Sequence, residues 1–210
     1  MNYSQHGEDS IIFNLLKELE FNHPGTLLDI GANDGITYSN SRMFIETLGW
    51  GGILIEPTTN CAESLNSLYS DNNNIDVFNV AIAEEDGETT IFLGSLHNEG
   101  VNQVSTLNEV EKNYWERNRN VRYESEIVKT STLKTILSQS KFKSFDIISI
   151  DTEGKDLEIL KQVVENNLQP LFIIFEYNDN NDVLRNADAL LGNGYSKIHT
   201  NGINAIYKKL

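Results

Sequence analysis

The sequence predicts an α/β protein in which a mostly parallel sheet is covered by helices on both faces. The prediction rests on short apolar runs that alternate with segments of helical periodicity along the chain. It also rests on the dipeptide Asn201-Gly202, a strong hairpin signal, which indicates two short strands at 195–208 that add an antiparallel edge. With 210 residues, 39% of them hydrophobic, the chain suits one domain with a sizeable core.

The first half of the chain shows its elements through the spacing of apolar residues between polar turns. In the segment 9–19 these residues recur every third or fourth position, as in an amphipathic helix. The later apolar runs are short and continuous, as in strands buried on both faces. The expected elements are a helix at 9–19, a strand at 26–30, a helix at 39–48 opened by Ser39 or Asn40 and closed by Gly49, a strand at 52–56, a helix at 61–69 and a strand at 76–82.

The second half begins with a turn, Glu85-Asp86-Gly87-Glu88, which we expect to form a hairpin into a strand at 89–93. Residues 94–125 are polar and predicted to be irregular. The elements expected after them are a short helix capped by Thr132, a strand at 145–150, a helix at 154–166, a strand at 171–176, a helix capped by Asp182 and ended by Gly192, and the terminal hairpin.

The composition limits which partners the protein can bind and indicates its cellular compartment. The net charge of −15 and the pI of about 4.6 argue against nucleic acid or an anionic membrane as a bulk partner. Cys61 is the only cysteine, which excludes an internal disulfide and a cysteine-based zinc site. No segment has the pattern of a signal peptide or the length of a membrane span, so we expect a cytoplasmic protein.

The segment 27–35, Leu-Leu-Asp-Ile-Gly-Ala-Asn-Asp-Gly, carries the strongest functional signal. It predicts a buried strand that runs into a turn, where Gly31 and Gly35 allow the backbone to approach a ligand closely. About twenty residues later a second apolar run ends in Glu56, whose carboxylate can accept both hydroxyls of a ribose. Together they predict a nucleoside site at the carboxyl edge of the sheet.

The character of this turn favours one class of nucleoside. A dinucleotide fingerprint is Gly-x-Gly-x-x-Gly, whereas this turn is Gly-x-x-x-Gly and carries Asp29, Asn33 and Asp34. The acids would repel a pyrophosphate and suit a ligand with a cationic amino-acid end, which describes S-adenosylmethionine. Asp29 either lies near the ammonium of that ligand or stabilises the turn.

Six motifs, in order along nearly the whole chain, resemble the FkbM family of S-adenosylmethionine-dependent methyltransferases. They are Ser4-Gln5-His6-Gly7-Glu8-Asp9, Asp29-Ile30-Gly31-Ala32-Asn33-Asp34-Gly35, Tyr38-Ser39-Asn40, Gly49-Trp50, Ile55-Glu56-Pro57 and Ile150-Asp151-Thr152-Glu153-Gly154. The resemblance implies a class I methyltransferase (Rossmann-like) fold in one domain over 1–210, with an N-terminal helical motif at 1–22. It implies O-methylation of a sugar, glycan or other secondary metabolite. The expected cofactor-binding residues are Asp29, Gly31, Asn33, Gly35, Asn40, Glu56 and, unless its side chain ties down a loop, Asn79.

Acidic residues follow the strands at 145–150 and 171–176, where the reaction crevice of this fold lies. Asp151 and Glu153 could supply a general base, bind a divalent metal or merely cap the following helix. Asp151, Glu176 and Asn178 stand where catechol-type O-methyltransferases hold magnesium, a positional likeness only. His199, on the terminal hairpin, is a further candidate for the catalytic base.

The polar segment 94–125 is a candidate acceptor cap. Its tyrosines and tryptophan could stack on a sugar, and Arg117, Arg119 and Arg122 could hold a phosphate or carboxylate. These arginines could equally pair with glutamates on a solvated helix. The expected partner is a small-molecule or glycan acceptor, and the sequence indicates no oligomeric state. Two other functions stay open: a nicotinamide-dependent oxidoreductase on a related fold, and a non-catalytic binding module.

Overall fold

The computed structural model describes residues 2–94 and 104–210. Its helices are α1 (Glu8–Glu18), α2 (Arg42–Leu48), α3 (Thr59–Leu68), α4 (Glu109–Arg119), α5 (Leu133–Gln139), α6 (Asp156–Glu165) and α7 (Asn181–Leu191). Its strands are β1 (Thr26–Ile30), β2 (Gly51–Ile55), β3 (Ile75–Phe78), β4 (Ala81–Ile82), β5 (Gly87–Gly94), β6 (Tyr123–Ser131), β7 (Ile147–Ile150), β8 (Phe172–Glu176), β9 (Tyr195–Thr200) and β10 (Asn204–Lys209).

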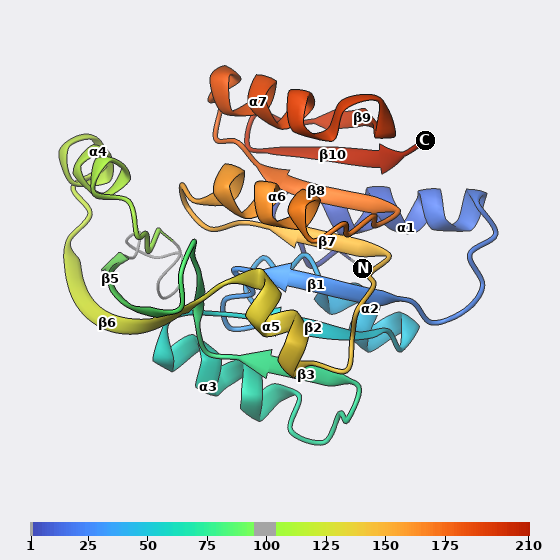
Figure 1. The fold of residues 1–210 in the computed structure, drawn as a ribbon, viewed down its shortest axis with the longest axis horizontal. Coiled ribbons are helices and arrows are strands. Elements are labelled where there is room, and N and C mark those ends of the chain that lie inside the picture. The colour runs from blue at the N-terminus through green and yellow to red at the C-terminus, as the bar shows by residue number, and fades with distance from the viewer. Residues whose placement is uncertain (1, 95–103) are drawn as a thin grey trace.

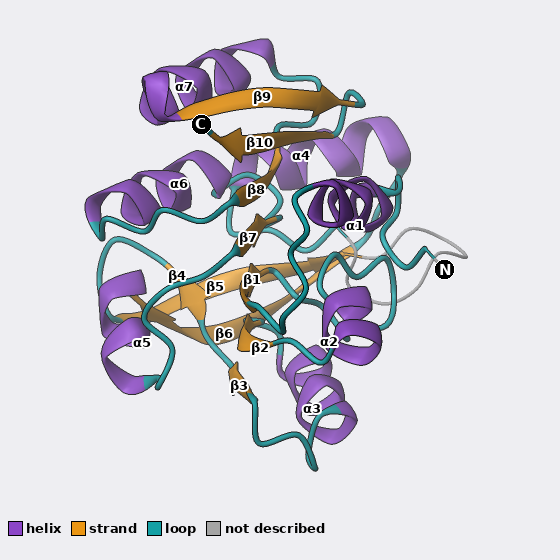
Figure 2. Cartoon of the chain, turned by 90° about the vertical axis from the view of Figure 1, so that its right-hand side faces the viewer, coloured by secondary structure: helices purple, strands orange, loops and turns teal. Residues whose placement is uncertain are grey.

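A seven-stranded sheet in the order β3-β2-β1-β7-β8-β10-β9 forms the centre of the molecule (Figure 1). The first five of these strands are parallel, while β10 pairs antiparallel with β8 and with β9. Helices α1, α2 and α3 cover one face, and α5, α6 and α7 cover the other (Figure 2). The predicted fold class is therefore confirmed, including the hairpin around Asn201-Gly202.

The apolar strands explain why this sheet forms. Every residue of β2, β7 and β8 is buried, because each strand packs helices on both faces. Side chains that alternate along a strand therefore enter two separate cores. Ile148 packs toward α5, α6 and α7, whereas Ile147 packs toward α1, α2 and α3.

A second, three-stranded sheet in the order β4-β6-β5 corrects three predictions. The predicted strand 76–82 ends at Phe78, and β4 belongs to the second sheet, where it pairs with β6. Between the two strands, the Asn79 side chain donates to the carbonyls of Glu56 and Pro57. The turn at 85–88 makes no hairpin with the preceding strand, since β5 pairs with β6 instead. The predicted irregular segment 94–125 contains α4 and the start of β6, although residues 95–103 lie outside the described part.

Two predicted helix starts also need correction. Helix α2 begins at Arg42, whose backbone N–H donates to the Ser39 hydroxyl, so the chain turns for longer before the helix than expected. Helix α7 is capped by Asn180, which accepts from the backbone of Asp182 and Val183. The Thr132 cap of α5 is confirmed. In the described part of the chain, no helix has the length and apolar character needed to cross a membrane.

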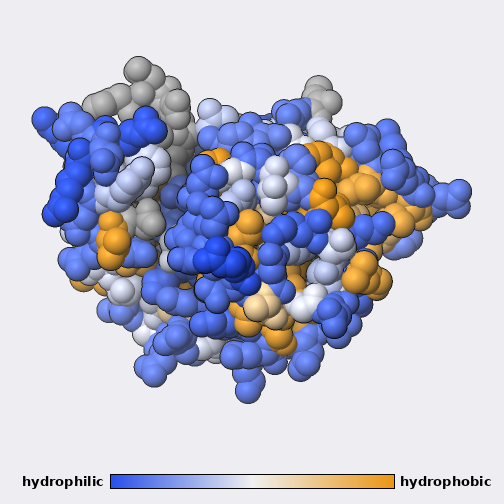
Figure 3. All heavy atoms as spheres, turned by 90° about the horizontal axis from the view of Figure 1, so that it is seen from above, coloured by the Kyte–Doolittle hydropathy of each residue, from blue (hydrophilic) through white to orange (hydrophobic). Residues whose placement is uncertain are grey.

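The second sheet and α4 stand beside the edge at which the parallel strands end (Figure 1). Seen from above, the surface over α4 is mostly hydrophilic (Figure 3). This arrangement places a cap opposite the end of the sheet where ligands bind in open α/β folds.

Candidate active site

A cavity of about 320 Å³ lies between the carboxyl ends of the parallel strands and the second sheet. Its floor comes from the loops after β1, β2, β7 and β8, and its opposite wall includes Leu107 and Trp115 of the cap. Five carboxylate side chains line it, and the cationic or titratable basic side chains among the lining residues are Lys155 and His6. The excess of negative charge favours a cationic ligand. The acids are Asp29, Glu56, Asp151, Glu153 and Glu176.

The first part of the glycine turn, Gly31-Ala32-Asn33, lines one end of the cavity, whereas Gly35, a predicted cofactor-binding residue, packs against Leu65 and Leu68 and is not among the lining residues described. Gly31 adopts a φ of 91°, and its N–H donates to the Ile55 carbonyl at 2.9 Å, which fastens the turn to β2. A Cβ atom at Gly31 would lie 1.7 Å from the Asp151 carbonyl oxygen. Glycine is therefore required both for the backbone angle and for the close approach of β1 to β7.

Glu56 connects the turn to the end of β2. One carboxylate oxygen accepts from the Thr58 N–H at 2.9 Å and the Thr58 hydroxyl at 2.7 Å, and the other accepts from the Asn33 N–H at 3.0 Å. Burial raises the pKa of Glu56, and these bonds oppose that increase. The carboxylate is thus held in one orientation at the cavity wall, as a ribose-binding acid requires.

Asp29 and Asn40 form a polar floor beneath the turn. Asp29 is 3% exposed, accepts hydrogen bonds from Ser41 and Ser149, and has a pKa raised by burial to about 6. The Asn40 amide donates to the Ser149 hydroxyl at 3.1 Å. Both side chains line the cavity. Asn79, a predicted cofactor-binding residue, is not among the lining residues described. Its side-chain amide donates to the backbone carbonyls of the loop after β2, and the next residue, Val80, lines the cavity instead.

The acids after β7 and β8 meet in one cluster. Asp151, Glu153 and Glu176 each offer a carboxylate oxygen, and these oxygens all lie within 4.8 Å of one another. The Glu153 N–H donates to Glu176 at 3.2 Å, and Glu153 has a φ of 52°, which few non-glycine residues adopt. Oxygen donors at this spacing suit either a shared proton or a hard divalent cation.

The electrostatics of this cluster favour bound protons. Desolvation, followed by the nearby charges of Asp156 and Asp29, raises the pKa of Asp151 to about 7. Desolvation and the charges of Asp151 and Glu153 raise the pKa of Glu176 well above its ordinary value. A carboxylate with a pKa near neutrality can accept a proton during catalysis.

The helix-cap interpretation of Asp151 is wrong. Asp156 holds the loop instead, because its carboxylate accepts from the N–H groups of Thr152 at 2.8 Å and Gly154 at 3.0 Å. Asn178 donates to Glu176, and Glu153 joins the cluster in the place where we expected Asn178.

The structure does not bring His199 to the cavity. It lies on β9, the outermost strand, opposite Ile206, and is not among the lining residues described. Two residues that the sequence did not predict for the site, Gln5 and His6, lie on the cavity rim. Both belong to the motif Ser4-Gln5-His6-Gly7-Glu8-Asp9, from which the sequence predicts no site residue.

Comparisons with known proteins identify the family and the fold. The family model described as the methyltransferase FkbM domain matches residues 29–196. The chain is similar to a methyltransferase FkbM from Methylobacillus flagellatus KT (TM-score 0.55, 14% identity), covering 88% of this chain and 43% of that one. It therefore spans less than half of that protein. No curated protein matches the sequence.

Other solved structures share the fold. The methyltransferase domain of METTL16 has a TM-score of 0.53 and 12% identity, covering 96% of this chain and 65% of that one. The human methyltransferase 10 domain containing protein has a TM-score of 0.50 and 12% identity, covering 96% of this chain and 81% of that one.

Proposed function

Because the chain belongs to the FkbM methyltransferase family, we propose that it moves the methyl group of S-adenosylmethionine to a hydroxyl oxygen of a small molecule or glycan. One observation carries the proposal. The glycine turn, the ribose-binding Glu56 and the carboxylate cluster all line a single cavity. Cofactor and acceptor would then meet at the end of β7, between the turn and Glu176.

The cofactor half of the cavity suits S-adenosylmethionine. The backbone at Gly31 and Ala32 lines the cavity and would face the methionine part, and Asp29 supplies negative charge beneath it. Glu56 would accept a ribose hydroxyl with the one carboxylate lone pair that Thr58 and Asn33 leave unused. A nicotinamide dinucleotide is disfavoured, because its pyrophosphate would face these acids.

The acceptor half contains the chemistry needed to activate a hydroxyl. A methyl transfer is an in-line displacement, so the oxygen must lie near the sulfonium methyl and lose its proton. Asp151 stands closest in the fold to the glycine turn, with Glu153 and Glu176 beside it. A carboxylate of this cluster accepts the proton, and its neighbours tune the pKa of that group.

The same three side chains would hold a divalent cation such as Mg²⁺, since their donors are hard oxygens within reach of one ion. When bound, such an ion lowers the pKa of a hydroxyl. In either case Asp151, Glu153 and Glu176 orient the acceptor and fix where its proton goes.

Residues of the cap determine which acceptor is bound. Trp115 on α4 lines the cavity and can stack on a sugar ring. Three exposed arginines continue from it along the cap and could bind an anionic group farther out on the acceptor. The net charge of −15 still disfavours nucleic acid or an anionic membrane as the partner.

Calorimetry and a turnover assay test the proposal. S-adenosylmethionine should bind at least about tenfold more tightly than NAD⁺. S-adenosylhomocysteine should accumulate with one of three probes, the methyl glycosides of glucose, rhamnose or fucose. Tighter binding of NAD⁺ would favour an oxidoreductase, and binding of S-adenosylmethionine without turnover would favour a binding module. Loss of turnover in EDTA, with recovery in Mg²⁺, would identify the metal-assisted route.

A further inference from the structure

The N-terminal segment before α1 is fixed to the rim of the cavity although it forms neither helix nor strand. Ser4, Glu8 and Asp9 are buried, whereas Gln5 and His6 between them are exposed on the rim. Asp9 accepts from the Ser4 hydroxyl at 2.8 Å, which closes the segment into a compact turn. The segment therefore presents two polar side chains to the cavity from a buried anchor.

Glu8 is the centre of that anchor, and it is fully buried. One carboxylate oxygen accepts from the amides of Asn201 and Asn204, each at 2.9 Å, and the other accepts from the His6 N–H at 3.1 Å. Burial alone would raise the pKa of Glu8, but the amide and backbone donors outweigh it and hold the pKa below its ordinary value. A charged carboxylate thus joins the two ends of the chain, 193 and 196 residues apart.

The position of this anchor determines which half of the cavity the N-terminal segment borders. Asn204 stands opposite Glu176 in the β8–β10 register, so Glu8 lies beside the carboxylate cluster. Glu56 follows β2, on the far side of β1 and β7 from β8. The segment therefore borders the half in which we place the acceptor, away from the ribose-binding end.

We propose that Gln5 and His6 contact the acceptor, and that Glu8 is a positioning residue that holds them there. The inference rests on the proposed function. A hydroxylated acceptor between the carboxylate cluster and this segment would gain hydrogen bonds from the Gln5 amide and the His6 imidazole on its outer side. The segment then acts as a wall of the acceptor site, and Glu8 determines its distance from Glu176.

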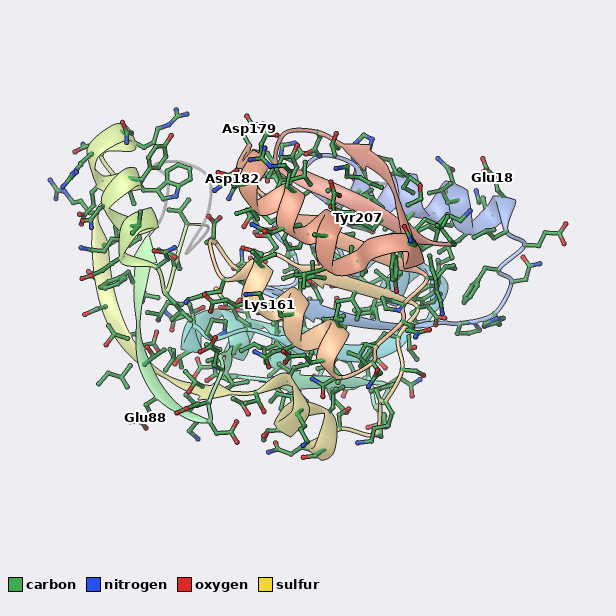
Figure 4. All side chains as sticks on the ribbon, turned by 45° about the horizontal axis from the view of Figure 1, so that its top comes forward. Glu18, Glu88, Lys161, Asp179, Asp182 and Tyr207 are labelled. Carbon is green, nitrogen blue, oxygen red and sulfur yellow. The ribbon has the colours of Figure 1, made fainter. Side chains whose placement is uncertain are left out.

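Three variants test this inference: Gln5→Ala and His6→Ala remove the contacts, and Glu8→Gln disturbs the anchor. In Glu8→Gln the side-chain NH2 group faces either the His6 N–H or the two asparagine amides, all of which are donors, so one set of hydrogen bonds is lost. Glu18→Gln, on the exposed far end of α1, is the matched control (Figure 4). Gln5 and His6 are exposed, so their variants should fold normally.

The readouts are the acceptor KM for the best methyl glycoside probe, the kcat, and the Kd for S-adenosylmethionine. We expect the acceptor KM to rise about tenfold in each of the three variants, as the loss of one or two hydrogen bonds predicts. The Kd for S-adenosylmethionine should stay within about twofold of the parent value. The control should match the parent in all three quantities.

An unchanged acceptor KM in His6→Ala and Gln5→Ala would overturn the inference, and so would an equal loss of affinity for S-adenosylmethionine. In both cases the parent protein still turns over the probe, so the proposed function stands. If the parent protein turns over none of the probes, the proposed function fails and this inference fails with it.

Discussion

Replacing Asp151 with asparagine should abolish most of the activity and, at the same time, stabilise the folded protein above neutral pH. Both effects come from one carboxylate. Asp151 lies within 4.8 Å of the carboxylate oxygens of Glu153 and Glu176, and its carbonyl oxygen packs against Gly31. An asparagine of nearly the same shape can still hydrogen-bond to Glu176, but it cannot accept a proton.

The sign and size of the stability effect follow from the pKa of Asp151, which is raised from 3.8 to about 7. The folded protein holds this proton more tightly than the unfolded chain does. The contribution of the proton to the free energy of unfolding is therefore fully present below pH 4 and is lost as the pH rises through 7. The raised pKa corresponds to about 4 kcal/mol at most. Since the side chain is partly exposed to water, we expect a gain of about 1–3 kcal/mol for Asp151→Asn at pH 8.

Urea unfolding at pH 4 and pH 8, in EDTA, measures this effect. The parent and Asp151→Asn should unfold at similar urea concentrations at pH 4, and the variant should unfold at a higher one at pH 8. Turnover should fall by about 10²–10⁴-fold, while the affinity for S-adenosylmethionine is retained. Glu88→Gln, on exposed β5, is the control (Figure 4). Full activity, or lower stability of Asp151→Asn at pH 8, would refute the reasoning.

Three further predictions concern the turn, the ribose site and the cap. Glu56→Ala should weaken binding of S-adenosylmethionine by about 1.5–3 kcal/mol in calorimetry, and unchanged binding would contradict the assignment. Gly31→Ala should cost more than about 4 kcal/mol or prevent folding, because its Cβ meets the Asp151 carbonyl, whereas Gly49→Ala, with no atom within 4 Å, should cost about 1–2 kcal/mol in urea unfolding. Replacing the cap arginines Arg117, Arg119 and Arg122 together with alanine should raise the acceptor KM and leave the cofactor Kd unchanged. An equal loss of affinity for acceptor and cofactor would count against a separate acceptor-binding cap.

The central sheet was predictable because its signals are local. The buried parallel strands are mostly apolar, and most of the candidate site residues follow them directly. The glycine turn was predictable for the same reason, since Gly31 adopts the positive φ that such a turn requires. Glu56 then falls where the second strand ends.

The second sheet was not predictable because its pairing depends on residues far apart in the chain. Gly87 lies opposite Thr130, so β5 pairs with a segment about forty residues downstream, which no local sequence pattern indicates. Helix α4 is mostly polar and exposed, and it lacks the apolar periodicity that indicates a helix. The place of Asn79 depended on a tertiary contact, the carbonyls after β2, which no local pattern reveals.

The carboxylate cluster depends on register, which is a property of the folded sheet. Ile30, Ile150 and Phe175 lie side by side on adjacent strands, so the next residues, Gly31, Asp151 and Glu176, continue as a row. The pairing of Glu176 with Asn204 extends that row to β10, where Glu8 is anchored. Side chains one residue beyond a shared register point to the same face. A single row therefore joins the glycine turn, the clustered acids and the N-terminal anchor, and a one-residue slip of β8 would separate Glu176 from Asp151.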